Sequence, residues 1–514
     1  MSMSDLLIVN PSALQRIYQS LSNEYAAIEP PIWAALLAKS LLTKGYSVEL
    51  MDCEGSHIPV EDAAQLIKDS SPTLVAIVVY GQQPSASTQN MHGASLLASE
   101  IKKLNPNQKV IMLGGHVSAL PKQTLEEESI DFVAHGEGLY TLEGLLNTDL
   151  SRVDLLTKIP GLWYRDEFGL VKGNPNATVI AKENLATELP GMAFDLLPMK
   201  NYRAHNWHCF DDIENRQPYA SVYTSLGCPY SCSFCCINAP FGKSSFRYWD
   251  PEFIIKQFDI LANDYNVKNV KIADEMFVLH DRHFMRLCEL LKERNYGFNI
   301  WAYSRVDTVK PKHLQALKNA GVNWLVLGIE SVSKRVRDGV IKGRFEEDSI
   351  PQIVKLIQDH DIRVHGNYIF GLPDDDFESM KMNLDAAMEM NCEMANFYSA
   401  MAYPGSALYS MAGEENWTLP DSWIGYSQHS IETLPLPTKH LSAGEVLAFR
   451  DKAWQAYYTN PRYHEMLKQK FGPAVSQHIH GLTQHKLKRK FAESNPKMEF
   501  SYPHFDSRDF QILT

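Results

Sequence analysis

Three cysteines, Cys228, Cys232 and Cys235, lie close together in the chain with the spacing C-x3-C-x2-C. Three thiolates on one tight loop can ligate three corners of a cubane iron–sulfur cluster and leave the fourth iron open for catalysis. A closed zinc site needs four ligands, and no second C-x2-C or His pair matches this one, so a zinc knuckle is the weaker alternative. We interpret the adjacent Cys236 as a packing thiol, because neighbouring side chains usually diverge.

The composition limits the class of protein that carries this motif. The 514 residues are 45% hydrophobic and 21% charged, which is typical of a soluble protein with several domains. The formal charge of -12 argues against nucleic acid as a partner. No run approaches the roughly 18–20 apolar residues of a membrane span, and none resembles a signal peptide. Eight cysteines are too sparse for a disulfide framework, so we expect reduced thiols in the cytoplasm.

Residues 1–150 alternate short apolar runs with helical patterns, which predicts a doubly wound, Rossmann-like parallel sheet. Ligands of such sheets bind at the carboxyl ends of the strands. The first strand is not followed by G-x-G-x-x-G, and the chain has no P-loop, so we expect no dinucleotide site. The expected strands are 6–10, 48–52, 74–80, 110–113 and 131–134.

The rest of the chain divides into three segments. Residues 151–215 predict a hairpin and a linker, and residues 216–405 predict six βα units, which form a partial TIM barrel with its active site at the strand ends. Residues 406–514 predict a mostly helical region that caps the pocket and holds the substrate. Its basic run at Lys486, Lys488, Arg489 and Lys490 is typical of a solvated helix face, without a functional role.

A cysteine motif directly after the first strand of such a barrel resembles the radical S-adenosylmethionine enzymes. The resemblance implies a 4Fe–4S cluster on Cys228, Cys232 and Cys235, with S-adenosylmethionine bound to its open iron. Asp274 and Glu275 correspond to the family's contact with the methionyl amino group. The remaining implied contacts, to ribose, carboxylate or adenine, are Ser304, Arg305, Glu330, Ile369 and Gly371.

The first domain resembles the cobalamin-binding domain that is fused to many of these enzymes. The implied cobalamin contacts are Gly114, Gly115, Ser118, Gly136 and Glu137, where small residues would let the nucleotide tail lie beside the sheet. The string D-x-H-x-x-G is absent, so within the resemblance the cobalt has no histidine ligand. A flavodoxin-like domain that binds no cofactor is the alternative.

Together the two resemblances imply a cobalamin-dependent radical enzyme. The expected reaction is transfer of a methyl group from methylcobalamin to an unactivated carbon or phosphorus, after a 5′-deoxyadenosyl radical has removed a hydrogen atom. Its expected partners are a small-molecule substrate and an external low-potential electron donor of the flavodoxin or ferredoxin kind. A radical cyclase or oxidoreductase with the same cofactors, and a cobalamin and iron–sulfur sensor or electron carrier, are the alternatives.

Overall fold

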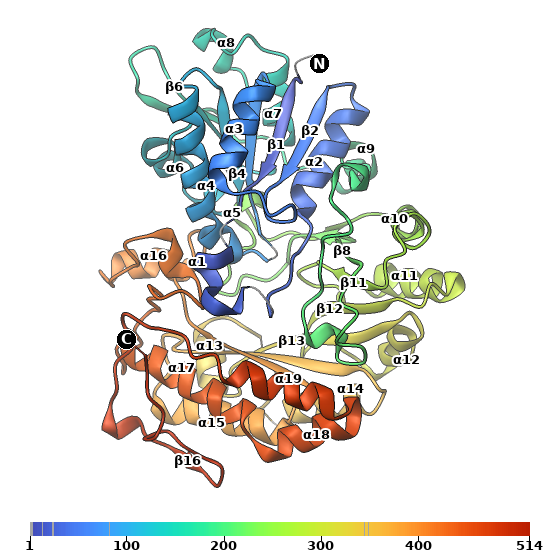
Figure 1. The fold of residues 1–514 in the computed structure, drawn as a ribbon, viewed down its shortest axis with the longest axis vertical. Coiled ribbons are helices and arrows are strands. Elements are labelled where there is room, and N and C mark those ends of the chain that lie inside the picture. Colours follow the sequence, from blue (N-terminus) through green and yellow to red (C-terminus); the bar gives the residue numbers. More distant parts are fainter. Residues whose placement is uncertain are drawn as a thin grey trace.

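The computed structural model describes residues 4–12, 14–22, 25–81, 83–343, 345–347 and 349–513, and it has three layers from top to bottom in Figure 1. The first is a seven-stranded sheet of order β2-β1-β3-β4-β5-β6-β7. Its parallel strands are β1 Leu6–Asn10, β2 Val48–Asp52, β3 Leu74–Val79, β4 Val110–Gly114 and β5 Phe132–Ala134. They confirm the doubly wound sheet.

Helices cover both faces of this sheet because its strands are apolar on both sides. On one face α2 (Ile32–Thr43) and α7 (Leu139–Leu146) pack against Leu6, Ile8 and Ala76. On the other, α3 (Val60–Ser70) and α4 (Ala86–Leu104) pack against Leu7 and Val9. The shorter helices of this part are α1 Leu14–Tyr18, α5 Gly115–Ala119, α6 Pro121–Glu127, α8 Val153–Leu156 and α9 Leu185–Glu188.

The expected hairpin belongs to the first sheet. Its strands β6 (Leu162–Arg165) and β7 (Val171–Gly173) are antiparallel, and β6 pairs with β5. The unit built on this sheet therefore extends through β7, and the chain then crosses to the second sheet.

The second sheet has six parallel strands in the order of the sequence, with β8 and β15 at its two edges. This is the predicted partial barrel. The strands are β8 Tyr219–Val222, β11 Asn269–Ile272, β12 Asn299–Arg305, β13 Val322–Glu330, β14 Arg363–Phe370 and β15 Met394–Ser399. The helices are α10 Pro251–Asn263, α11 Asp281–Arg294, α12 Pro311–Asn319, α13 Lys334–Gly339, α14 Ser349–Gln358 and α15 Phe377–Met390.

The C-terminal region, whose helices lie at the bottom of the molecule in Figure 1, packs against the edge strand β15 through α17 (Ala443–Tyr458). The Tyr458 hydroxyl on α17 donates to the Ala395 carbonyl at 2.6 Å, and Tyr457 donates to Cys392 at 2.7 Å. The elements of this region are α16 Ala407–Glu414, α17 Ala443–Tyr458, α18 Pro461–Phe471, α19 Pro473–Thr483, and the hairpin β16 Ser501–Tyr502 with β17 Phe505–Asp506.

The N-terminal segment and the C-terminal region meet beside the barrel. The Gln19 amide donates to the His429 carbonyl at 2.6 Å, and the Ser427 hydroxyl donates to the Ile17 carbonyl at 3.3 Å. Among the described residues, no helix has the length and apolar character needed to cross a bilayer.

One prediction about the C-terminal region is wrong. The basic run at residues 486–490 is not helical, and Arg489 in its middle is fully buried instead of solvated. Its guanidinium pairs with Asp451, a partner 38 residues away that the local charge pattern does not reveal.

Candidate functional site

The open barrel contains a cavity of about 420 Å³. Its walls come from the barrel strands, the N-terminal segment and the C-terminal region, and Cys235 and Cys236 line it too. Much of the lining is aromatic: Tyr18, Tyr25, Trp207, Trp301, Tyr303, Phe397, Tyr398, Tyr403 and Trp454. The cavity therefore joins the cysteine loop to the region expected to hold a substrate.

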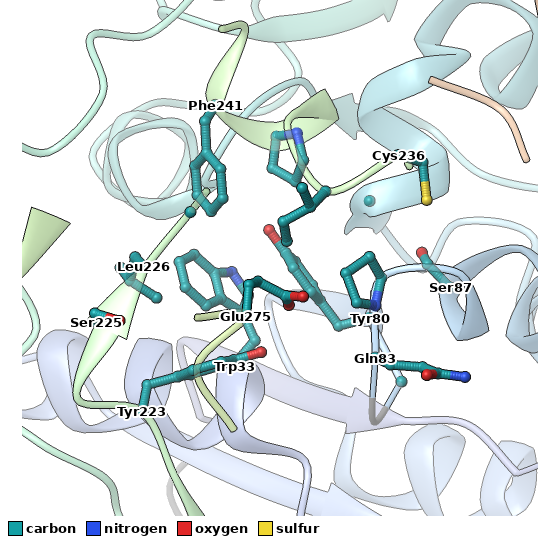
Figure 2. A pocket seen from close by; sticks show the side chains of 16 residues that line it. Trp33, Tyr80, Gln83, Ser87, Tyr223, Ser225, Leu226, Cys236, Phe241 and Glu275 are labelled. Atoms are coloured by element: carbon teal, nitrogen blue, oxygen red, sulfur yellow. The ribbon is translucent and has the colours of Figure 1, made fainter. Parts of the chain in front are cut away.

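A smaller hollow separates the first sheet from the barrel (Figure 2). Trp33 and Tyr80, which stack with ring centroids 4.9 Å apart, form a flat wall on the first-domain side. The Glu275 carboxylate of the barrel points into the same space in Figure 2. Among the described residues, four line both the hollow and the larger cavity: Gln83, Pro84, Cys236 and Glu275. The two spaces therefore adjoin beside the cysteine loop.

The cysteine loop follows β9 (Ser225–Leu226) and carries Cys228, Cys232 and Cys235 as half-buried free thiols. A tight turn brings the last two together, since the Cys235 amide donates to the Cys232 carbonyl at 3.0 Å. Burial raises the pKa of Cys228 to about 11, so thiolates here need a nearby positive charge or metal. The described residues include no group of three or more His, Cys, Asp and Glu side chains that could hold a single metal ion. In a cubane cluster each of the three cysteines would bind a different iron.

Asp274 and Glu275 have different surroundings. The buried Asp274 carboxylate accepts hydrogen bonds from the amide and hydroxyl of Thr224, at 2.6 and 2.5 Å, and from those of Ser225, at 3.0 and 2.7 Å. These four donors saturate Asp274, so it fixes the start of the cysteine loop. Glu275 faces the space shared by the two cavities, and burial raises its pKa to about 8. Of the predicted pair, Glu275 is the one available to a ligand.

Arg305 lies at the cysteine loop. Its Nη1 is 3.5 Å from Cys232 Sγ, its guanidinium stacks 3.9 Å from the Tyr230 ring centroid, and Nε and Nη2 donate to Asp307 at 2.8 Å. The neighbouring Ser304 hydroxyl is buried and has no hydrogen-bond partner among the described residues. Arg305 thus contacts the cysteine loop, whereas the Ser304 hydroxyl is available to hydrogen-bond a ligand.

Glu330 lines the cavity in an unusual backbone conformation. It has φ +62° at the end of β13, where the register with β14 shifts, and such a conformation costs a non-glycine residue about 1–2 kcal/mol. The Lys342 ammonium pairs with its carboxylate at 2.5 Å, and Asn383 donates to its carbonyl at 2.9 Å. These two contacts hold the strained residue in place.

The two predicted adenine contacts have different surroundings in the structure. Ile369 lines the cavity, whereas Gly371 packs under the C-terminal region. A Cβ on Gly371 would lie 2.4 Å from Val446 Cγ1 on α17, and its φ of +81° also favours glycine. Gly371 therefore allows α17 to approach.

The predicted cobalamin contacts of the first domain also differ in their surroundings. Gly115 lines the hollow. Gly114 has φ +149°, and a Cβ there would lie 2.0 Å from the Val79 carbonyl oxygen, so only glycine fits against β3. The Ser118 hydroxyl accepts from the Gly136 amide at 3.1 Å and lies 3.2 Å from its carbonyl, which fixes the loop after β5.

Glu137 joins the first domain to the barrel. Its carboxylate pairs with Arg247 at 2.9 Å and accepts from the Ile180 amide at 2.6 Å, while its carbonyl accepts from Trp33 Nε1 at 3.1 Å. Arg247 belongs to β10 (Arg247–Tyr248), the strand that pairs with β9. All of these groups are buried, so Glu137 is an interdomain contact.

The sequence analysis missed several cavity residues. Lys271 pairs with Glu29 at 2.8 Å, and Glu29 in turn lies 3.1 Å from His205 Nε2. Lys271 could have been found, because it is a charged residue within β11, three residues before the predicted Asp274. Trp33 and Arg450 belong to no motif, and only the folded chain brings them to these spaces.

Comparison with family models matches the two domains separately. Residues 19–146 match the B12 binding domain, and residues 222–387 match the Radical SAM superfamily. The chain is 30% identical over 463 residues to an uncharacterized methyltransferase of Pyrococcus horikoshii, covering 90% of this chain and 93% of that protein.

Two further proteins resemble the chain over most of its length. It is 24% identical over 424 residues to the anaerobic magnesium-protoporphyrin IX monomethyl ester cyclase of Rubrivivax gelatinosus, covering 80% of this chain and 70% of that protein. Among solved structures, the radical S-adenosylmethionine methyltransferase TsrM of Kitasatospora setae, with cobalamin and a 4Fe–4S cluster bound, shares the fold with a TM-score of 0.63. That match is 18% identical and covers 90% of each chain.

Proposed function

The chain belongs to the radical S-adenosylmethionine superfamily and carries the B12-binding domain of its cobalamin-dependent members, and on that premise we propose that it methylates an unactivated carbon or phosphorus of a small molecule. Its cofactors are a 4Fe–4S cluster, S-adenosylmethionine and cobalamin. When bound, the first two supply a 5′-deoxyadenosyl radical and the third supplies the methyl group.

The single observation that carries this proposal is the junction of the two spaces. Cys236 and Glu275 line both the hollow against the first sheet and the cavity inside the barrel. A methyl donor held in the hollow would therefore adjoin a substrate held in the cavity, beside the cysteine loop.

We assign the chain's own residues as follows. Cys228, Cys232 and Cys235 hold the cluster, and Glu275 receives the methionyl amino group. The Trp33–Tyr80 stack gives cobalamin a flat apolar wall. The aromatic lining of the larger cavity excludes water and competing hydrogen donors from a reactive radical.

The proposal also includes an electron donor and a cellular compartment. A low-potential electron donor of the flavodoxin or ferredoxin kind would reduce the cluster. All eight cysteines are free thiols, which favours the reducing cytoplasm as the place where the enzyme works.

Anaerobic reconstitution with iron, sulfide and hydroxocobalamin tests the cofactors. We expect about four irons and one cobalamin per chain, and 5′-deoxyadenosine when the reduced protein receives S-adenosylmethionine. Cys232→Ala should abolish 5′-deoxyadenosine formation, whereas Cys288→Ala, which removes a buried thiol on α11, should preserve it. Formation by Cys232→Ala would refute the cluster assignment, and its absence from the wild type would favour a sensor or electron carrier.

A radical cyclase is the second candidate, and the similarity to the Rubrivivax cyclase favours it. The mass of the product separates the two. Methyl transfer adds one methylene and carries the label from methyl-deuterated S-adenosylmethionine, whereas cyclisation removes hydrogen and carries no label.

A further inference from the structure

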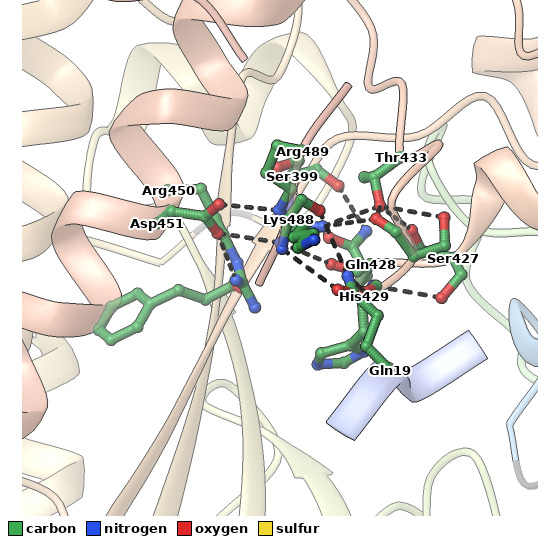
Figure 3. Close-up of polar contacts among 12 residues, drawn as sticks. Gln19, Ser399, Ser427, Gln428, His429, Thr433, Arg450, Asp451, Lys488 and Arg489 are labelled. Carbon is green, nitrogen blue, oxygen red and sulfur yellow. Dashed lines mark hydrogen bonds and ion pairs between the residues drawn. The ribbon is translucent and has the colours of Figure 1, made fainter. Parts of the chain in front are cut away.

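Figure 3 shows a buried cluster of two arginines and one aspartate, of which Arg450 lines the barrel cavity. Arg489 donates from Nε and Nη2 to the two oxygens of Asp451, at 2.8 and 3.0 Å. Arg450 donates from Nη1 to the same carboxylate at 2.7 Å and from Nε to the Phe397 carbonyl at 2.7 Å. Arg489 also donates to the Thr433 hydroxyl at 2.9 Å. One carboxylate thus faces two guanidinium groups.

The cluster therefore has a net charge of +1, and Arg450 is its member that lines the cavity. Burial lowers the pKa of Arg450, which means that solvent does little to stabilise its charge. Buried charges in proteins are normally paired, and Asp451 is shared with Arg489. An anionic ligand group would balance this charge.

The other charged side chains described along the cavity are balanced. Lys271 pairs with Glu29 at 2.8 Å, and Glu330 pairs with Lys342 at 2.5 Å. Glu275, with its pKa raised to about 8, is largely protonated at neutral pH. The positive excess in the described lining is therefore found at Arg450.

Arg450 and the cysteine loop reach the cavity from different elements. Arg450 comes from α17 and contacts β15, whereas Cys235 and Cys236 follow β9. The cavity that they line is walled by aromatic rings, among them Trp301, Tyr303 and Tyr398.

We propose that the substrate is a monoanion with a planar apolar body, and that its carboxylate pairs with Arg450 while its body lies among the aromatic rings. A single carboxylate matches the net charge of the cluster, whereas a phosphate dianion would exceed it. The proposal rests on the proposed function, since it names the class of substrate for that cavity.

Three probes with the same naphthyl body test this inference on the reconstituted protein with S-adenosylmethionine bound: 2-naphthoate, its near-isosteric neutral analogue 2-naphthamide, and the larger 2-naphthyl phosphate. Binding is measured by calorimetry and by quenching of tryptophan fluorescence. We expect naphthoate to bind at least about tenfold more tightly than the amide. Equal binding of the two, or no binding of naphthoate, would overturn the proposal. Tighter binding of the phosphate would overturn the carboxylate assignment.

Substitutions test whether Arg450 causes the preference for naphthoate over naphthamide. Arg450→Gln should bind naphthoate and naphthamide equally, and Arg450→Lys should keep part of the preference. Arg335→Gln, which removes an exposed arginine, should behave as the wild type. An unchanged preference in Arg450→Gln, or an affinity of that variant for S-adenosylmethionine about tenfold below the wild type, would refute the assignment.

Iron and cobalamin contents show whether each variant is folded. Arg450→Gln leaves Asp451 paired with Arg489, so its charge balance should permit folding. Binding needs no turnover, so a naphthoate preference without 5′-deoxyadenosine formation would refute the proposed function and leave the anion site standing.

Discussion

Arg305 lies with its Nη1 3.5 Å from the sulfur of Cys232, while Asp307 holds the other side of the guanidinium at 2.8 Å. The positive charge of this arginine is thus fixed next to one corner of the assigned cluster. Net charge and hydrogen bonds to sulfur are main determinants of cluster potential.

Removing this charge should lower the reduction potential of the cluster. Arg305→Met should shift it negative by tens of millivolts in a redox titration followed by electron paramagnetic resonance, because the reduced cluster loses a nearby cation. Arg305→Lys should shift it less. A potential in Arg305→Met equal to that of wild type would contradict the role given to this contact.

Asp274→Asn should destabilise the start of the cysteine loop. The amide cannot accept all four hydrogen bonds from Thr224 and Ser225, so we expect a loss of about 2–4 kcal/mol in urea unfolding at pH 8, together with a lower iron content. At that pH the wild-type carboxylate, with a pKa of about 6, is ionised. Asp338→Asn, which breaks an exposed pair with Lys334, should cost less than about 0.5 kcal/mol. Equal effects of the two substitutions would refute this prediction.

Glu275 should make the protein without cofactors less stable as the pH rises. Its pKa is raised from 4.5 in the unfolded chain to about 8 by burial. Between these values the folded protein retains a proton that the unfolded chain has lost, so Glu275 lowers stability by up to about 1.4 kcal/mol per pH unit. Above the folded pKa the loss is complete. Glu275→Gln removes this contribution, so the free energy of unfolding of this variant should increase relative to that of the wild type as the pH rises. If the two free energies of unfolding changed in parallel with pH, Glu275 would not titrate in this range.

Gly114→Ala should cost far more than an ordinary glycine substitution. Gly45 also has a positive φ, of +94°, but a Cβ there meets nothing within 4 Å, so Gly45→Ala measures the backbone cost alone. The added clash with Val79 should make Gly114→Ala worse by at least about 2 kcal/mol in urea unfolding. If the two alanine variants were equally stable, β3 and β4 would have to be able to move apart.

The strands of the first sheet were predictable because buried parallel strands are continuous apolar runs, as in β1 and β3. The cysteine spacing was also visible, because a single loop carries the whole motif. What the sequence did not show was the direction of individual side chains at strand ends. Asp274 and Glu275 are neighbours in sequence, yet one is saturated by Thr224 and Ser225 and the other faces the cavity.

Partners that are distant in the chain explain the remaining differences. Gly371 meets Val446, and Arg489 meets Asp451, and neither contact leaves a local pattern. The C-terminal region carries no recognisable motif, so the sequence alone could not predict that Arg450 lines the cavity.

The contact between the N-terminal segment and the C-terminal region has a consequence for biosynthesis. Gln19 meets His429 and Lys488, and Arg450 shares Asp451 with Arg489, so this side of the barrel cavity is complete only after nearly the whole chain has been synthesised. A chain cut short before Lys488 would lack this wall, so its barrel could not exclude water from a reactive radical.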